Sequence, residues 1–110
     1  MTHLVIVLPT AERDLDQILT WLYRRSPLGS KKWLERWDET RETLTENPER
    51  CALAPESKLH PIPIHQIIFR TRKGNPYRAL FAIQENKVFV IHIRGTGQRL
   101  IRRISFPINE

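Results

Sequence analysis

The sequence contains little cysteine and no long hydrophobic run, and each shortage excludes a class of protein. Its single cysteine, Cys51, permits no internal disulfide, which fits a protein of a reducing compartment. The apolar run near the start, residues 4–8, is far too short to cross a membrane. This run also lacks the basic lead and the small-residue cleavage site of a signal peptide. The sequence therefore predicts a cytoplasmic protein that does not insert into a membrane.

Negative charge is scarce in the second half of the chain. Residues 1–56 hold 8 Lys and Arg against 10 Asp and Glu, whereas residues 57–110 hold 10 against 2. Such segregation favours a polyanionic partner, with nucleic acid first and an acidic protein or a membrane surface behind it. A solvated basic surface is the plainer alternative. The length predicts one domain, residues 1–110, in which residues 98–110 form a basic C-terminal tail.

The first quarter of the chain predicts a strand followed by a helix. Residues 3–8 are β-rich and nearly all apolar, which is typical of a buried central strand, and Pro9 ends the run. Apolar residues then recur at helical spacing over residues 11–25. We expect Thr10 to cap this helix at its N-terminus.

A second helix is predicted directly after the first. Ser26 and Pro27 supply an N-cap and a first helical position, and the helix is expected to run to about residue 46. The short connection predicts an antiparallel helix hairpin. Trp33 and Trp37 lie four residues apart on one face, which favours a place in the core over a ligand site.

The proline-rich stretch over residues 48–64 predicts a long surface loop. Glu56 lies in this loop, where a carboxylate is more often solvated than catalytic. Strand character resumes over residues 65–72. No helix or strand is assigned to the tail.

Residues 77–97 alternate in a way that predicts a β-hairpin turning near Glu85 and Asn86. An odd loop length would bring Phe81 opposite Ile91 and assemble one apolar face. That face should lie beneath the two helices; its members are Ala79, Phe81, Ile83, Phe89, Ile91 and Ile93.

The element order is therefore β-α-α-β-β-β. It predicts an α+β fold in which a two-helix hairpin packs on one face of a mainly antiparallel sheet.

The same register gathers cations on the opposite face. Arg78 lies opposite Arg94, and because like charges in that position repel, an anion is expected between them. With the preceding strand, this face is expected to carry Arg70, Arg72, Arg78, His92 and Arg94.

These residue types fit metal-independent RNA cleavage by the RNA's own 2′-hydroxyl. That reaction needs a base, cations for the growing charge on the phosphoryl oxygens, and an acid. We expect Arg78 and Arg94 to hold the scissile phosphate and His92 to move the proton. The expected RNA anchors are Arg70, Arg72, Lys73 and Arg99. No side chain is assigned as the acid, and a packed, non-catalytic His92 is an equal alternative.

No metal or cofactor is expected. His60 and His65 have neither the spacing nor the neighbouring Cys or acidic residues of a metal site.

Five segments stand together in a characteristic order. They are Thr10-Ala11-Glu12-Arg13-Asp14-Leu15, Ser26-Pro27 with Trp33, Asn47-Pro48 followed by Ala54-Pro55-Glu56, Tyr77-Arg78-Ala79-Leu80-Phe81, and His92-Ile93-Arg94-Gly95. In these segments the chain, up to about Gly97, resembles the RelE/ParE superfamily of bacterial toxins from type II toxin–antitoxin (plasmid stabilisation) modules.

This resemblance implies a microbial-RNase-like fold and a cognate antitoxin that wraps around the toxin. RelE-like members cleave mRNA in the ribosomal A site, whereas ParE-like members poison DNA gyrase. By strand position, Arg70 and Arg72 match the paired basic residues of RelE-like proteins, and Arg78 and Arg94 match two further arginines. One departure is the missing tyrosine near the C-terminus, where this chain has Arg99, Arg102 and Arg103.

The sequence-based hypothesis is a toxin that cleaves ribosome-bound mRNA and is neutralised by its antitoxin. The alternatives are a gyrase inhibitor without nuclease activity and an inactive homologue that only binds the antitoxin. The antitoxin is expected to offer an acidic segment that folds on the basic half and on apolar residues of the tail, such as Phe106. Trp33 or Trp37 would add contacts if partly exposed.

Overall fold

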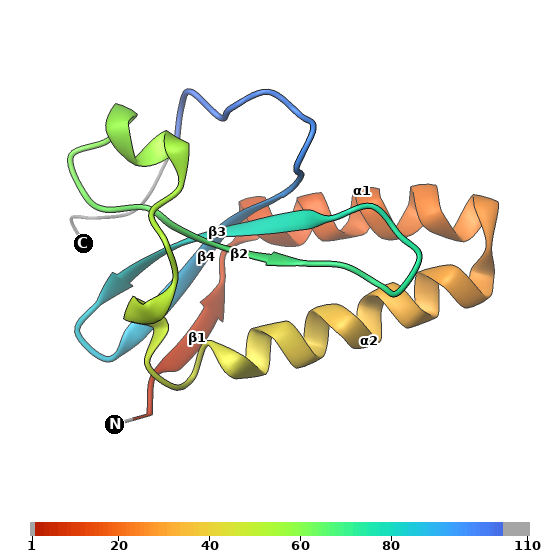
Figure 1. Ribbon diagram of the computed structural model, residues 1–110, viewed down its shortest axis with the longest axis horizontal. Helices are drawn as coiled ribbons and strands as arrows, with labels where there is room; N and C mark the ends of the chain where they lie inside the picture. Colours follow the sequence, from red (N-terminus) through yellow and green to blue (C-terminus); the bar gives the residue numbers. More distant parts are fainter. Residues whose placement is uncertain (1, 105–110) are drawn as a thin grey trace.

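The computed structural model describes residues 2–104 and has the predicted element order (Figure 1). Phe106 therefore lies outside the described residues. The regular elements are β1 (Leu4–Val7), α1 (Pro9–Arg25), α2 (Pro27–Thr43), β2 (His65–Phe69), β3 (Tyr77–Gln84) and β4 (Lys87–Gly95). Two short 3-10 turns, Pro48–Arg50 and Pro55–Leu59, interrupt the proline-rich loop. The α+β fold is confirmed.

The sheet has the strand order β1-β4-β3-β2, and β1 is an edge strand. It pairs in parallel with β4, while the other two pairings are antiparallel. The prediction that β1 is central was wrong. The apolar sequence of β1 suggested burial on both sides. In the structure Val5 and Val7 pack against the core beneath the helices, whereas Leu4 is 59% exposed.

The two helices form the predicted antiparallel hairpin, and Figure 1 shows them side by side and joined at the right-hand end. Ser26 caps α2, since its hydroxyl accepts a hydrogen bond from the N–H of Gly29 at 2.9 Å. The cap of α1 differs from the prediction. Leu8 occupies the N-cap position, and the Thr10 hydroxyl instead donates to the carbonyl of Ile91 at 2.6 Å. Thr10 thus holds the start of α1 against β4.

Beneath the helices, Trp33 and Trp37 are both buried, which confirms their place in the core. Both rings pack on Phe69 of β2, with ring centroids 5.4 and 5.5 Å apart. Because neither tryptophan is accessible, neither is a contact for a partner.

A β-bulge in β4 changes which residues face the helices. The turn at Glu85 and Asn86 has two residues, and Phe81 lies opposite Val90 instead of Ile91. Ile91 is therefore an extra residue, and beyond it Arg78 faces Arg94 as predicted. The bulge provides the one-residue offset that the sequence analysis assigned to an odd loop.

The bulge also produces a second apolar cluster on the far face of the sheet. Val88 and Val90 face the helices, whereas Ile91 and Phe89 lie on the opposite side, so their predicted burial beneath the helices was wrong. The second cluster contains Ala54, Ile64, Leu80, Ala82 and Ile91, with Leu8, Ile62, Ile101 and Ile104 packed against it. The proline-rich loop and the tail thus cover much of the face expected to be an open cationic surface.

Candidate functional site

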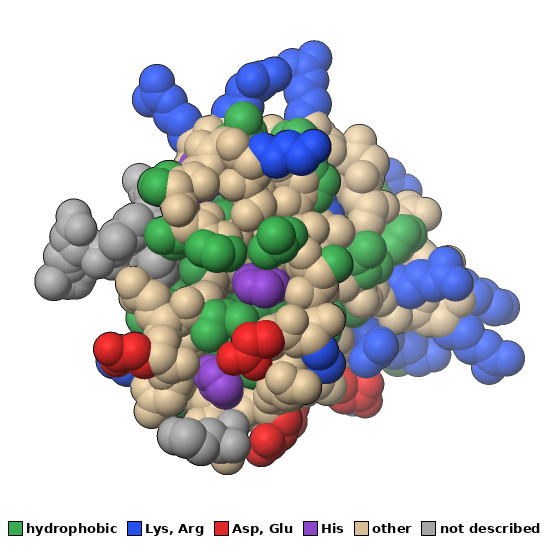
Figure 2. All heavy atoms as spheres, turned by 60° about the vertical axis from the view of Figure 1, so that its left-hand side comes forward, with side chains coloured by type: hydrophobic (Ala, Val, Ile, Leu, Met, Phe, Trp, Pro, Cys, Tyr) green, Lys and Arg blue, Asp and Glu red, His purple; other side chains and the backbone are tan. Residues whose placement is uncertain are grey.

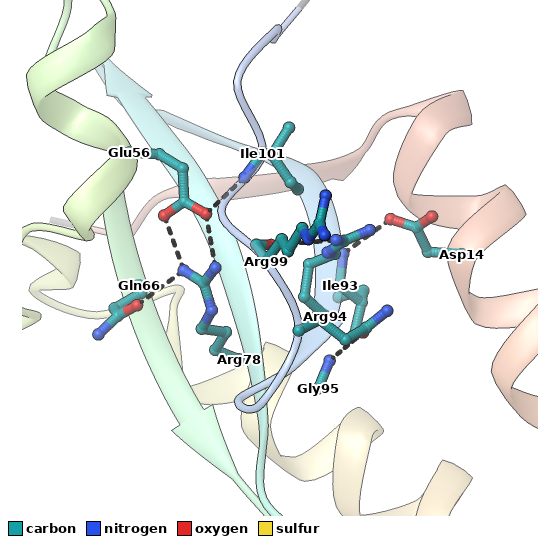
Figure 3. A network of polar contacts seen from close by, with 10 residues as sticks. Asp14, Glu56, Gln66, Arg78, Ile93, Arg94, Gly95, Arg99 and Ile101 are labelled. Atoms are coloured by element: carbon teal, nitrogen blue, oxygen red, sulfur yellow. Dashed lines mark hydrogen bonds and ion pairs between the residues drawn. The ribbon is translucent and has the colours of Figure 1, made fainter.

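A buried ion pair lies at the centre of the predicted site. Arg78 on β3 is 5% exposed, and Glu56, in the second 3-10 turn, is fully buried. The guanidinium makes two parallel contacts with the carboxylate, Nη1 to Oε1 at 2.8 Å and Nη2 to Oε2 at 2.5 Å (Figure 3). Nη1 also donates to Oε1 of Gln66 at 3.1 Å. The guanidinium of Arg78 is therefore occupied by groups of the chain itself.

Glu56 remains ionised in this environment. Burial alone raises the pKa of a carboxyl group, but here hydrogen bonds outweigh it and the pKa of Glu56 is lowered from its usual value. The donors are the side chain of Arg78, the backbone N–H of Ile101, which lies 3.0 Å from Oε2, and the backbone N–H of Glu56 itself. The prediction that Glu56 is solvated was wrong, and the signal that could have found it was an arginine in an otherwise apolar strand, which required a counter-charge.

The tail is tied to the end of β4. Arg94 is partly buried, and its Nη2 donates to the carbonyl of Arg99 at 3.0 Å. The N–H of Gly95 donates to Oε1 of Gln98 at 2.7 Å. Figure 3 shows Arg94 and Arg99 close to the Glu56 network. Arg78 and Arg94 therefore both have acceptors from the chain, and the anion expected beside Arg78 is a carboxylate of the same protein.

His92 is held by a carboxylate that sequence reasoning missed. Its Nδ1 lies 2.8 Å from Oδ2 of Asp14 on α1, and the N–H of Ile93 donates to the same oxygen at 3.0 Å. Asp14 follows Thr10 by one helical turn, so both lie on the face of α1 that docks on β4. With Nδ1 engaged, Nε2 is the imidazole nitrogen left for another partner.

His92 opens into a cavity of about 460 Å³ between the tail and the start of α1. The cavity is lined by Thr10, His60, His92, Arg102, Arg103 and Ile104. Sequence reasoning did not place His60, Arg102 or Arg103 in this site. It treated His60 as a possible metal ligand, and the two arginines as a departure from the family pattern.

Arg70 and Arg72 lie elsewhere, because β2 ends at Phe69 and the chain turns away. Both line a hollow beside α2 with Lys32, Glu35, Arg36, Glu39 and Thr71. The Arg36 side chain holds this turn, since its Nε donates to the carbonyl of Arg70 at 3.2 Å. Lys73 is exposed in the same turn. In the view of Figure 2, Lys and Arg side chains likewise form separate groups with uncharged and apolar surface between them.

Within residues 2–104 no three His, Cys, Asp or Glu side chains gather as they would around a metal ion. Neither helix in this range is long and apolar enough to cross a membrane.

Comparison with known proteins identifies the family. Residues 5–100 match the family described as the ParE toxin of the type II toxin–antitoxin system parDE. The chain belongs to the ParE toxin family. Membership confirms the predicted RelE/ParE relationship, and it implies a cognate antitoxin as partner.

A solved structure supports the fold of this ParE family member. It is described as the chromosomal ParDE TA system from P. aeruginosa, with a TM-score of 0.63 and 18% sequence identity. The match covers 86% of this chain and 96% of that one. No curated protein matches the chain.

Proposed function

We propose that this toxin acts by binding DNA gyrase and does not cut RNA. The observation that carries the proposal is the buried pair between Arg78 and Glu56. Membership of the ParE family supports it, because ParE-like members of the superfamily poison gyrase. Cleavage of mRNA, the sequence-based hypothesis, is the alternative that the experiments below test.

The pair opposes a role for Arg78 in binding phosphate. A phosphate would have to displace the Glu56 carboxylate, and breaking a buried ion pair costs about 3–5 kcal/mol. The tail adds a second obstacle, because the N–H of Ile101 binds the same carboxylate and its side chain packs on the far-face apolar cluster. RNA cleavage at this site would first require the protein to break the buried ion pair and to move the tail. Both requirements oppose catalysis there.

The antitoxin should recognise this toxin through charge. Residues 57–110 hold 10 Lys and Arg against 2 Asp and Glu, so an acidic segment is favoured. Co-expression with the product of the neighbouring reading frame tests this partner. A complex that survives purification in low salt and weakens in high salt is expected; failure to co-purify in both would contradict the pairing.

Induction of the chain in cells separates the two modes of action. We expect gyrase–DNA cleavage complexes to accumulate while primer extension shows intact mRNA. Cuts within ribosome-bound mRNA, without gyrase complexes, would overturn the proposal.

An assay with purified components removes indirect effects of growth arrest. The folded chain is expected to inhibit DNA supercoiling by gyrase and to leave relaxation by a type I topoisomerase unchanged. The heat-unfolded chain serves as the control at equal concentration. Equal inhibition of both enzymes would indicate non-specific DNA binding and would contradict a specific action on gyrase.

A further inference from the structure

We propose that the cavity between the tail and the start of α1 binds a phosphate group. This site is separate from the Glu56–Arg78 pair, and a phosphate could bind there whether or not the toxin acts on gyrase. Five polar side chains line it: Thr10, His60, His92, Arg102 and Arg103.

The charge of the lining favours an anion. Arg102 and Arg103 are always ionised, and no carboxylate belongs to the lining among the described residues. Asp14 is the acidic group behind the cavity. Its carboxylate oxygen already accepts hydrogen bonds from the N–H of Ile93 and from Nδ1 of His92, on the far side of the imidazole. Asp14 therefore orients His92 so that Nε2 is the nitrogen left for a ligand.

His60 adds a second imidazole to the lining of the cavity. Its Nε2 is buried and has no hydrogen-bond partner within residues 2–104. The backbone holds His60 in place, since its N–H donates to the carbonyl of Ser57 at 3.3 Å and ends the 3-10 turn.

The start of α1 strengthens the same preference. Thr10 lies in the first turn of this 17-residue helix, where the helix dipole places partial positive charge. Guanidinium groups, imidazoles and a helix start together match the several oxygens of a phosphate better than a single carboxylate.

The size of the cavity indicates which phosphates fit. A volume of about 460 Å³ exceeds what a lone phosphate ion fills and lies in the usual range of small-molecule sites. The ligand is therefore a phosphate attached to a larger group, either a free nucleotide or the backbone of a nucleic acid.

The histidine ring signals in an NMR titration test the site on the full chain. The sequence has four histidines, of which His60 and His92 line the cavity, while His3 and His65 do not. With AMP as the probe, we expect the signals of His60 and His92 to shift saturably and those of His3 and His65 to stay in place. Equal shifts at all four, or no saturable shift, would overturn the proposal.

A matched pair of double variants controls for overall charge. Arg102→Ala/Arg103→Ala should weaken AMP binding at least tenfold, whereas Arg70→Ala/Arg72→Ala, which removes the same charge from the separate hollow beside α2, should change it less than twofold. All four side chains belong to residues at the surface or in turns, and thermal unfolding checks that both variants fold. Equal losses in the two variants would show a general electrostatic effect and would contradict a built site.

Competition then distinguishes the two sources of the phosphate. A short single-stranded oligonucleotide that displaces AMP, and does so less well from Arg102→Ala/Arg103→Ala, assigns the site to nucleic acid. An oligonucleotide that leaves AMP bound assigns it to a free nucleotide. Displacement that is the same for this variant and the unchanged chain would contradict the site.

Discussion

Glu56 and Arg78 are 22 residues apart in the chain and form a two-contact ion pair that is almost completely shielded from water. The pair joins the proline-rich loop to β3, and the N–H of Ile101 joins the tail to the same carboxylate. Three segments distant in sequence thus meet at one charged group. The stability of the far side of the sheet should depend on it.

Removing the charge of Glu56 should destabilise the protein strongly. Glu56→Gln leaves the Arg78 guanidinium buried without a counter-ion, and the expected loss in the free energy of unfolding is about 3–5 kcal/mol. Urea unfolding followed by circular dichroism measures it.

The double variant Glu56→Gln/Arg78→Met is the control for this prediction. It removes both charges, so its loss should be smaller than that of Glu56→Gln alone. A double variant less stable than the single one would show that the charges are not coupled as the contacts indicate.

The same ion pair predicts how the free energy of unfolding changes with pH. The pKa of Glu56 is lowered in the folded protein, so the pair contributes fully above the unfolded-state pKa of about 4.3. This contribution is lost as the pH falls from that value through the lowered folded-state pKa. Unfolding free energies measured between pH 7 and pH 3 should decline at the acid end, and Glu56→Gln should show a shallower decline. Identical slopes would contradict the shift.

The turn between β3 and β4 contains a strained residue whose replacement should stabilise the protein. Glu85 has a φ of 56°, in the left-handed region that costs a non-glycine residue about 1–2 kcal/mol. Part of this gain is offset by the greater freedom of glycine when unfolded, so Glu85→Gly should add about 0.5–1 kcal/mol. Chemical unfolding measures the change. Asn86→Gly is the matched control at a position without positive φ, and it should give no gain.

His92 tests whether toxicity needs proton transfer. If the toxin acts on gyrase without cutting RNA, His92→Gln should keep growth inhibition within about tenfold of the unchanged chain, measured as surviving colonies after induction at matched protein levels. Loss of a general base would instead lower an RNA-cleavage rate by about 10²–10⁴-fold. Abolished toxicity in a folded His92→Gln protein would favour the nuclease.

Local signals account for the parts of the fold that sequence reasoning predicted. The Ser26–Pro27 boundary depends on groups within one helical turn, and the buried face of Trp33 and Trp37 follows from helical spacing. These features depend on near neighbours and on periodicity, which a single sequence contains.

Tertiary structure decided the features that depend on contacts distant in the chain. The bulge at Ile91 forms where β4 meets α1 and the tail, and alternation alone does not reveal an extra residue. Glu56 became the counter-ion of Arg78, and His60 came to line the cavity with His92, only through the path of the proline-rich loop. The sequence by itself determined which charged groups exist and predicted that Arg78 and Arg94 face each other. Folding decided which of those groups neutralise one another and which remain for a ligand, because that choice depends on burial and on the distances between segments that periodicity does not encode.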